Sequence, residues 1–271
     1  MRARLKVARN WLASKDRLSV LALRIRRALS VEKPLAIEGT QLRFTADSWL
    51  ELDRTQSVVE TWTADWVRSL PPRSVLWDVG ANIGIFALLA AENPNVDMVV
   101  ATEPAFFNYA SLLRNALRNN LTDKVIALPV GLGEESAALP FNLQNLKSGG
   151  SLHGFGDLFP FHRDDGDPAA SYTCLCYRLD DLAAIPGLPF PTHIKLDIDG
   201  HELAVLRGSE TTLADPRLVG LQVEVMDHDP ALPRREELVA VLAGHGWQLN
   251  ETIAHRSTAP IVADLRFARP G

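Results

Sequence analysis

Short apolar runs alternate with segments of helical spacing along most of the chain. The apolar runs are continuous and short, which is typical of buried strands in a parallel sheet. They lie at residues 74–79, 98–101, 124–130, 193–196 and 218–225, with two more strands within 247–266. Segments of helical spacing separate or follow them, at residues 85–91, 109–120, 235–244 and from about His201 onward. This alternation predicts an α/β fold with a mostly parallel sheet and helices on both faces.

The first 70 residues depart from this pattern and are predicted to form an N-terminal extension. Apolar residues recur at helical spacing in a basic stretch, at Leu18, Leu21, Ile25 and Leu29. A hairpin is predicted around Gly39, and a helix over residues 49–70. Pro71 and Pro72 close the extension, because proline ends helices. Residues 71–271 are predicted to form the main domain.

Residues 141–172 interrupt the alternation of strands and helices. This segment is rich in Gly, Asp, Phe and His and has little periodicity. A long irregular segment inside a compact domain is usually a lid, a binding loop or a disordered insertion. Phe155, Phe159 and Phe161 favour a lid, because disordered segments are poor in aromatic residues. We therefore predict a lid-like insertion here, with a return to strand at residues 172–177.

Charge is divided unevenly along the chain. The net charge is −5, but residues 1–30 carry nine Lys or Arg against one acid, so this segment is +8 and the remainder is −13. The basic amphipathic helix can dock on the acidic body of its own chain, on an acidic partner or on a membrane surface. An acidic body would repel phosphate, so nucleic acid is not expected as a substrate.

Composition otherwise indicates an ordinary globular protein, with 46% hydrophobic and 23% charged residues. No apolar run approaches the ~20 residues that a membrane-spanning helix needs. Arg24 interrupts the apolar stretch that a secretory signal would require. Cys174 and Cys176 are the only cysteines, and we expect no disulfide between them. A reduced, cytoplasmic location is therefore predicted.

The strongest chemical motif follows the first predicted strand, as Asp78-Val79-Gly80-Ala81-Asn82-Ile83-Gly84. Glycines here allow a tight strand-to-helix turn and a close approach of the backbone to a ligand. A nicotinamide dinucleotide site would have the spacing Gly-x-Gly-x-x-Gly, with amides aimed at a pyrophosphate. Two glycines four apart beside an acid instead favour S-adenosylmethionine. Asp78 can hold its ammonium, and the amides around Gly80 and Asn82 can meet its carboxylate.

Glu103 ends the second predicted strand, 25 residues after Asp78. A carboxylate in this place can accept both hydroxyls of a ribose, because it has one oxygen for each. Pro104 follows it directly, and Gly131 follows the third strand. The predicted cofactor-binding residues are Asp78, Gly80, Asn82, Gly84, Glu103, Pro104 and Gly131.

With these motifs the chain resembles the FkbM family of methyltransferases over roughly residues 56–250. The family has a Glu before the first strand, a DVGANIG-like loop, an EP dipeptide and a KIDVEGHE-like segment. Here these correspond to Glu60, residues 78–84, Glu103-Pro104 and residues 195–202, where Asp199 stands in place of the usual Glu. The resemblance implies a seven-stranded, Rossmann-like class I methyltransferase fold, S-adenosylmethionine as the cofactor, and direct in-line methyl transfer to an oxygen.

A second cluster of polar residues begins in the fourth predicted strand. Lys195, Asp197 and Asp199 alternate, so a strand would carry all three on one face at its carboxyl end, where open parallel sheets bind ligands. Either Asp197 or His201 can take a proton from an attacking hydroxyl. We predict Asp197, His201 and Lys195 as catalytic residues. Glu202 suits capping of the next helix as well as it suits function.

Further polar residues predict an acceptor site beside this cluster. Glu224 lies near the end of the next strand, and residues 148–153, with Ser151 and His153, resemble a Ser/Gly-rich loop of the family. The predicted substrate-binding residues are Glu60, Ser151, His153, Asp199 and Glu224. Asp197, Asp199, Glu224 and His228 are an alternative divalent-metal site. No tight ligand spacing supports that alternative, and no metal is predicted.

These features predict an S-adenosylmethionine-dependent methyltransferase that acts on a hydroxyl of a sugar or small-molecule metabolite. An N- or C-methyltransferase can use the same sheet, and so can a nicotinamide oxidoreductase, although the loop spacing disfavours the latter. The alternative outside catalysis is a cofactor-binding scaffold that serves a partner through its basic arm. Asp197 and His201 argue against such a scaffold.

Overall fold

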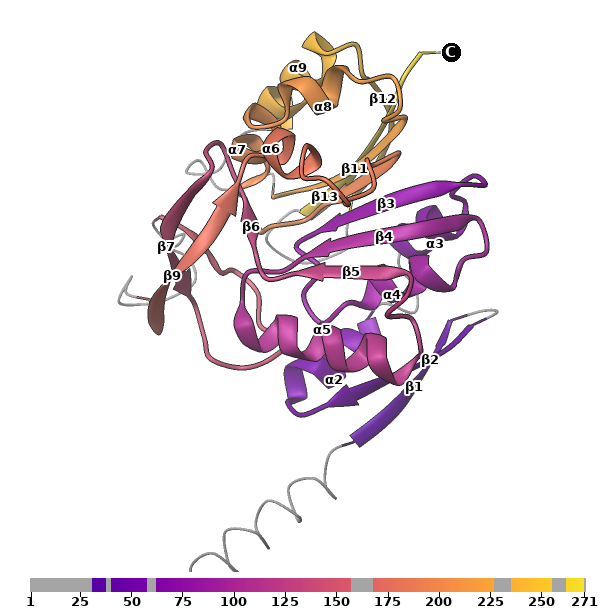
Figure 1. Ribbon diagram of the computed structural model, residues 1–271, viewed down its shortest axis with the longest axis vertical. Helices are drawn as coiled ribbons and strands as arrows, with labels where there is room; N and C mark the ends of the chain where they lie inside the picture. Colours follow the sequence, from indigo (N-terminus) through magenta and orange to yellow (C-terminus); the bar gives the residue numbers. More distant parts are fainter. Residues whose placement is uncertain are drawn as a thin grey trace, which may run out of the picture.

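The computed structural model of the protein describes residues 31–37, 40–57, 62–156, 168–226, 235–254 and 262–270. The basic helix predicted within residues 1–30, together with Glu60 and His228, lies outside this part of the chain. The described part contains a seven-stranded sheet with helices on both sides, a four-stranded sheet beside it and an N-terminal hairpin (Figure 1).

The central sheet has the strand order β12-β13-β11-β10-β3-β4-β5. Its strands are β3 (Ser74–Val79), β4 (Val96–Thr102), β5 (Val125–Leu128), β10 (His193–Leu196), β11 (Gly220–Met226), β12 (Gln248–Ala254) and β13 (Val262–Ala268). Neighbouring strands run parallel except at β13, which is antiparallel to both β11 and β12. The prediction of a seven-stranded, mostly parallel sheet is confirmed.

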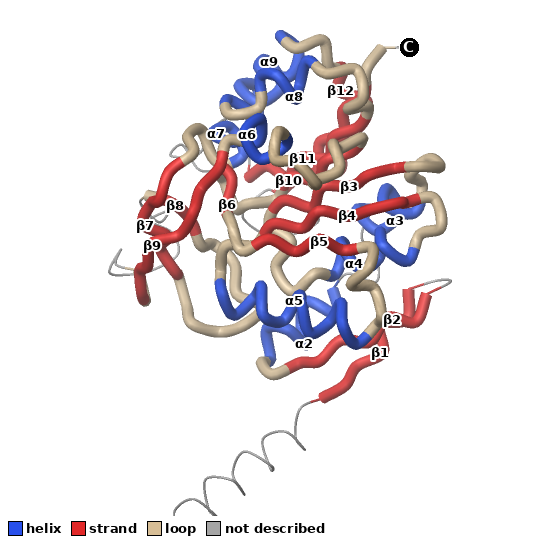
Figure 2. Tube along the Cα trace, in the orientation of Figure 1, coloured by secondary structure: helices blue, strands red, loops and turns tan. Residues whose placement is uncertain are grey.

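Helices cover both faces of this sheet (Figure 2), because its strands are apolar on both faces. They are α3 (Trp62–Arg68), α4 (Ile85–Glu92) and α5 (Phe106–Arg118) on one face, and α6 (Leu179–Ala183), α7 (Glu202–Arg207), α8 (Glu210–Ala214) and α9 (Arg235–Gly244) on the other. Each set of helices encloses a hydrophobic core against its face of the sheet. Leu76 of β3 packs in the first core, with α3, α4 and α5, whereas its neighbour Trp77 packs in the second core, on the opposite face. The short helices α6 and α8 are not predicted, because five residues are too few to show helical periodicity.

The N-terminal extension packs on the first of these cores. Strands β1 (Val31–Ile37) and β2 (Thr40–Ala46) pair as the predicted hairpin. Two helices, α2 (Trp49–Ser57) and α3, lie where a single helix is expected, and residues 58–61 between them are outside the described part. Leu42 and Phe44 of β2 are fully buried against α4 and α5. The extension therefore contributes side chains to the core of the main domain.

A second, four-stranded sheet occupies much of the segment expected to be irregular. Its order is β6-β9-β7-β8, formed by β6 (Gly131–Leu132), β7 (Ala137–Leu143), β8 (Gly154–Phe155) and β9 (Ala170–Tyr177). The expectation of an irregular segment over 141–172 is therefore wrong at both ends, and the return to strand is confirmed. Neither β7 nor β8 is predicted from the sequence, because β7 contains a proline and β8 is only two residues long. Residues 157–167 lie outside the described part, so the lid stays a prediction.

Both cysteines lie in β9. Cys174 and Cys176 are free thiols, and both are buried on one face of the strand, since residues two apart share a face. Burial raises the pKa of Cys176 to about 11. This thiol is therefore protonated at neutral pH and suited to packing.

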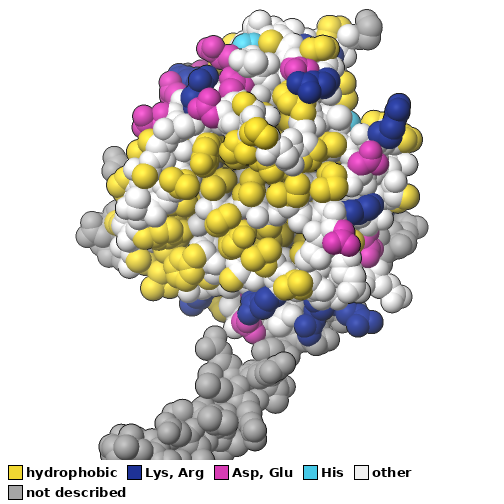
Figure 3. All heavy atoms as spheres, in the orientation of Figure 1, with side chains coloured by type: hydrophobic (Ala, Val, Ile, Leu, Met, Phe, Trp, Pro, Cys, Tyr) yellow, Lys and Arg dark blue, Asp and Glu magenta, His cyan; other side chains and the backbone are white. Residues whose placement is uncertain are grey.

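Apolar side chains reach the surface over much of one face. They cover the middle of the view in Figure 3, and charged side chains lie toward its margins. The most exposed large apolar side chains of the described part are Trp49, Phe106, Leu117, Leu146 and Leu175. Within the described ranges, no helix combines the length and the apolar character needed to cross a bilayer.

Candidate active site

The chain changes direction across the central sheet between β3 and β10. After β3 it adds β4 and β5 on one side, and it later returns to place β10 on the other side of β3. A crevice opens at such a switch point, at the carboxyl ends of the strands. The described residues form a pocket there, with walls from the β3–α4 loop, the end of β4, the β7–β8 loop, the segment after β10, and β11.

The β3–α4 loop touches the opposite wall at Gly80. Its φ is +81°, and a Cβ there would lie 1.9 Å from the backbone oxygen of Asp197, so only glycine fits. The Gly80 amide donates to the Thr102 oxygen at 3.0 Å, and the Asn82 amide donates to Glu103 Oε2 at 2.8 Å. The expectation that these amides meet a ligand carboxylate is therefore wrong, because acceptors of the protein already hold them.

Two residues of the motif lie behind the pocket wall. Asp78 is fully buried, and its Oδ1 lies 3.3 Å from Lys195 Nζ. Burial raises the pKa of Asp78, and the charge of Lys195 opposes that rise. Gly84 has φ +89° at the start of α4, where a Cβ would lie 2.2 Å from Leu112. Neither residue lines the pocket that the described residues form. Asp78 acts on the pocket only through its ion pair with Lys195, and Gly84 allows α4 to pack closely against Leu112.

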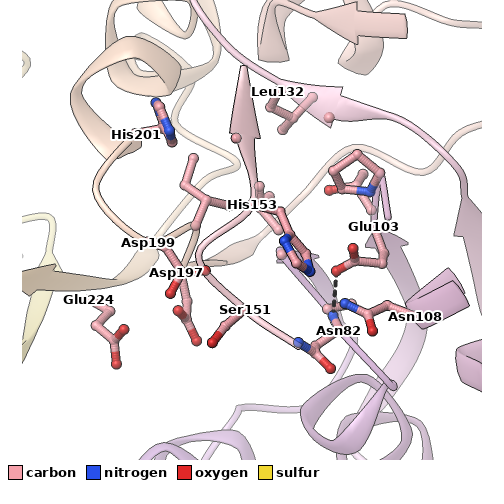
Figure 4. A pocket seen from close by; sticks show the side chains of 18 of the residues that line it. Asn82, Glu103, Asn108, Leu132, Ser151, His153, Asp197, Asp199, His201 and Glu224 are labelled. Carbon is pink, nitrogen blue, oxygen red and sulfur yellow. Dashed lines mark hydrogen bonds between the residues drawn. The ribbon is translucent and has the colours of Figure 1, made fainter. Parts of the chain in front are cut away.

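Glu103 presents a buried carboxylate at the end of β4. Oε2 accepts the Asn82 amide (Figure 4), and Oε1 accepts the Ala105 amide, both at 2.8 Å. Burial raises the pKa of Glu103 to about 7, although the amide bonds favour its charged form. Each oxygen of an ionised carboxylate can accept a second hydrogen bond. Glu103 can therefore accept two hydroxyls of a ligand, as the sequence predicts for a ribose.

Two buried polar atoms of the pocket wall have no hydrogen-bond partner among the described residues, namely Thr102 Oγ1 and His153 Nε2. The other ring nitrogen of His153, Nδ1, accepts the Gln144 amide at 3.0 Å. Burial lowers the pKa of this ring to about 4, so the ring is neutral at pH 7. A neutral ring whose Nδ1 accepts a hydrogen bond carries its proton on Nε2. At pH 7, His153 is therefore a donor toward the pocket rather than a base.

Lys195 holds two carboxylates at the other side of the pocket. Its buried Nζ lies 3.0 Å from Asp197 Oδ2 and 3.3 Å from Asp78 Oδ1. Burial alone would lower the pKa of Lys195, but Asp197 and Asp78 raise it above its usual value. Burial would raise the pKa of Asp197, but Lys195 outweighs burial and holds that pKa below its usual range. Asp197 is therefore ionised at neutral pH.

Glu224 and Asp199 join Asp197 in a cluster that we call the acidic end of the pocket. Burial, and then the charge of Asp197, raise the pKa of Glu224 well above its usual value and that of Asp199 to about 6. This shift favours the protonated form of Glu224 beside the ionised Asp197. One oxygen from each of the three carboxyls lies within 4.8 Å of the others, a spacing that one cation can bridge. Lys195 already pairs with Asp197, and a site without metal stays a prediction.

The strand alternation expected after β10 is wrong. β10 ends at Leu196, and Asp199 has a left-handed φ of +56°, so Lys195, Asp197 and Asp199 do not share a strand face. The turn after β10 is instead held by hydrogen bonds. Glu202 Oε1 accepts the amides of Ile198 and Gly200 at 3.1 Å, so Glu202 holds this turn rather than capping α7, whose N-cap is His201.

His201 lines the pocket beyond Asp199. In Figure 4 its ring lies above the carboxylates of Asp197 and Asp199. The ring packs on β8, where a Cβ at Gly154 would lie 2.2 Å from His201 Nε2. Burial lowers the pKa of His201, so the ring is neutral at pH 7. Asp197, the other candidate base, pairs with Lys195 at 3.0 Å.

Three further predicted residues, Pro104, Gly131 and Ser151, line the pocket. The last predicted residue, Glu60, lies outside the described part. Several lining residues are not predicted, namely Arg54, Phe86, Thr102, Asn108, Phe141 and Phe155. Asn108 has a sequence signal, because it lies in the first turn of the helix that follows Pro104. Arg54 and Phe141 have none, because α2 and β7 reach the pocket only through tertiary packing.

The pocket offers groups that fit the cofactor expected from the sequence. Glu103 has acceptor oxygens for a diol, and Thr102 Oγ1 and His153 Nε2 are polar atoms with no protein partner in the described part. Arg54 and Lys195 supply positive charge. A ligand with a ribose, an ammonium and a carboxylate finds complementary groups here.

The sequence matches proteins of one family. The sequence profile described as the methyltransferase FkbM domain matches residues 78–246. The chain is 33% identical over 199 residues to 31-O-demethyl-FK506 methyltransferase FkbM of Streptomyces tacrolimicus, covering 66% of this chain and 74% of that protein. It is 29% identical over 200 residues to hexuronic acid methyltransferase AglP of Haloferax volcanii, covering 72% and 76%.

A solved structure, that of a methyltransferase FkbM from Methylobacillus flagellatus, aligns with a TM-score of 0.46 at 17% identity, over 80% of this chain and 52% of that one. The profile match spans more than half of the chain and includes the β3–α4 loop, Glu103 and the acidic end. The chain therefore belongs to the FkbM family of S-adenosylmethionine-dependent methyltransferases.

Proposed function

We propose that the protein methylates a hydroxyl oxygen of a sugar or small-molecule metabolite. The observation that carries the proposal is the geometry of the acidic end, where Lys195 Nζ lies 3.0 Å from Asp197 and one oxygen from each of Asp197, Asp199 and Glu224 lies within 4.8 Å of the others. In this arrangement Lys195 lowers the pKa of Asp197, whereas burial raises the pKa of Glu224. Neighbouring carboxyls whose pKa values are driven apart are typical of acid–base sites. An alcohol needs a proton acceptor, because its proton must leave as the oxygen is methylated.

Asp197 is the proposed proton acceptor. Its carboxylate takes a hydrogen bond from the acceptor hydroxyl and then the proton itself. Lys195, at 3.0 Å, keeps this carboxylate charged until the proton arrives, and an oxygen of the Glu224 carboxyl lies within 4.8 Å of it. Asp199 and Ser151 line the same region and are proposed to bind other hydroxyls of the acceptor, as is His201.

The Glu103 end, which we define as Asn82, Thr102, Glu103 and Asn108, is proposed to hold the cofactor. Glu103 accepts the ribose hydroxyls, and Thr102 Oγ1 and His153 Nε2 bind further polar atoms of the ligand. The bound cofactor supplies a methyl group that its sulfonium has already activated. The protein's contribution is therefore to align the acceptor with this methyl group and to exclude water from the pocket. The apolar rings of Phe86, Phe141 and Phe155, which line the pocket, are proposed to exclude the water.

The names of two relatives support oxygen as the atom and a sugar or small molecule as the acceptor. One relative is named for 31-O-demethyl-FK506 and the other for a hexuronic acid. The acidic end supports a hydroxyl-rich acceptor independently, because its carboxyls provide several hydrogen-bond acceptors in one place.

The test is an acceptor panel with S-adenosylmethionine labelled with carbon-13 on its methyl group. Hydroxylated sugars, uronic acids and alcohols are compared with amine analogues of the same carbon skeleton. We expect release of S-adenosylhomocysteine with a hydroxyl acceptor and a methoxy signal in the product. An N-methyl signal would indicate an N-methyltransferase instead. Cofactor binding without transfer to any acceptor would favour a non-catalytic scaffold.

A further inference from the structure

The β7–β8 loop lies across the first turn of α2. Ser48 Oγ donates to the Ser148 oxygen at 2.5 Å, and Arg54 Nε donates to the Gly149 oxygen at 2.6 Å. Gly149 has φ +83°, and a Cβ there would lie 2.7 Å from the Glu51 nitrogen. The two backbones are therefore in direct contact, and α2 fixes the path of the loop.

Glu51, which is fully buried, lies at the centre of this contact. It forms a capping box with Ser48, since Oε2 accepts the Ser48 amide at 3.2 Å and Ser48 Oγ accepts the Glu51 amide at 3.1 Å. The other oxygen, Oε1, accepts the hydroxyls of Ser148 and Ser111, each at 2.6 Å. The capping box accounts for the hydrogen bonds of Oε2 only. The hydrogen bonds of Oε1 connect α2 to the β7–β8 loop and to α5.

The loop carries this restraint into the pocket. The Gly149 amide donates to Asn108 Oδ1 at 2.8 Å. The Gly150 oxygen accepts Asn82 Nδ2 at 2.8 Å and Asn108 Nδ2 at 3.0 Å. The Asn82 amide in turn binds Glu103. Asn82, Glu103 and Asn108 are therefore connected to α2 by a continuous set of hydrogen bonds.

We infer that Glu51 is a positioning residue for the cofactor pocket. Through Ser148 it sets the place of Gly150, whose carbonyl oxygen holds the Asn82 and Asn108 side chains. Glu51 itself does not line the pocket formed by the described residues, and it precedes the span 78–246 that matches the family. The inference rests on the proposed binding of the cofactor at the Glu103 end and does not depend on the acceptor.

The test is calorimetric binding of S-adenosylhomocysteine to full-length variants. Ser148→Ala removes the hydroxyl that joins the loop to Glu51 and leaves the capping box in place. We expect its Kd to rise about fivefold to tenfold, the scale of one ordinary hydrogen bond lost. The matched control is Thr55→Val, which removes a buried α2 hydroxyl bonded within the helix to the Leu52 oxygen at 2.7 Å. We expect this control to lower Tm and to keep Kd within about twofold.

Variants of the carboxylate itself provide a second measurement. Glu51→Ala is expected to raise Kd at least as much as Ser148→Ala, whereas Glu51→Gln should restore most of the affinity, because an amide can cap the helix and still bond the hydroxyls. Hydrogen exchange at the amides of Gly149 and Gly150 should become faster in Ser148→Ala and not in Thr55→Val.

Two outcomes would overturn the inference, even if Glu51→Ala does not fold. One is an unchanged Kd in Ser148→Ala, and the other is an equal loss of affinity in Ser148→Ala and Thr55→Val, which would indicate a general loss of stability. Glu103→Ala in the same titration tests whether the cofactor binds at the Glu103 end, separately from the positioning role of Glu51. If Glu103→Ala also keeps the wild-type Kd, the cofactor does not bind at the Glu103 end and the positioning role fails with it.

Discussion

The two ends of the pocket hold buried carboxylates in different ways. At the Glu103 end, one carboxylate is held by the backbone amides of Asn82 and Ala105. At the acidic end, Asp197 pairs with a single lysine and raises the pKa of its neighbours Glu224 and Asp199, of which, within the described part, only Asp199 accepts a backbone amide, that of Leu152 at 2.5 Å. Backbone amides fix a carboxylate without changing charge, which suits the binding of an invariant cofactor. Side chains that share charge respond to each proton gained or lost, which suits a group that must take one.

Asp197→Asn is expected to have the largest effect and to separate the two ends. Turnover should fall about 10²-fold or more, because the positioned proton acceptor is lost. The Kd for S-adenosylhomocysteine should stay within about twofold, because asparagine has the same shape and the Glu103 end is held by other contacts. Single-turnover methyl transfer and calorimetric titration measure the two quantities.

The matched control for Asp197→Asn is Glu134→Gln, which neutralises an exposed carboxylate 3.7 Å from Arg207 and should change neither quantity. Full turnover in Asp197→Asn would move the chemistry elsewhere, with Glu224 and His153 as the next residues to substitute. A loss of cofactor affinity as large as the loss of turnover would show that the two ends do not act separately.

At the Glu103 end the sequence predicts Asn82 and Glu103 and misses Thr102 and Asn108. Residues 78–84 and Glu103 follow two consecutive strands, β3 and β4, which lie side by side. Local order in the chain therefore becomes proximity in space. The role of the loop amides is nevertheless predicted wrongly, because the positions of Thr102 and Glu103 as their acceptors depend on the exact register of the two strands.

The acidic end is only partly predictable, because its contacts join distant segments. Asp197 is recognisable from its place after an apolar strand, but its link through Lys195 to Asp78 exists because β10 returns beside β3. The turn that carries Asp199 leaves the strand after Leu196, which no periodicity reveals. Arg54 enters the pocket from a helix of the N-terminal extension, far from any motif.

Glu103 is expected to give the next largest effect, and on affinity rather than on turnover. Glu103→Ala should weaken S-adenosylhomocysteine binding by about 1–3 kcal/mol, or roughly fivefold to 150-fold, because donors of the ligand and the Asn82 amide lose their acceptor.

A pH series measures the same carboxylate without a change in packing. Since burial raises the pKa of Glu103 to about 7, wild-type affinity should rise about tenfold from pH 6 to pH 8 as the carboxylate ionises, and Glu103→Gln should show no such rise. Equal slopes in both proteins would contradict the assignment. Because the pKa is raised on folding, ionisation of Glu103 makes the free protein less stable as pH rises toward and through 7, so the comparison requires Kd rather than Tm.

The smallest effect is expected at His201, and it decides between the two candidate bases. His201→Ala should lower turnover by less than about fivefold, because the ring lines the pocket and contributes contacts to the acceptor rather than a charge. His201 stands at the N-cap of α7 without a side-chain capping bond, so the substitution leaves that helix start intact.

The measurement is the pH–rate profile of His201→Ala beside that of the wild type between pH 5 and pH 9. Burial lowers the pKa of His201 below its usual value, so a histidine base would give the wild type an acidic limb near the lower end of this range. We expect profiles of the same shape. An acidic limb present in the wild type and absent from His201→Ala would assign the proton to His201 and leave Asp197 to orient the acceptor.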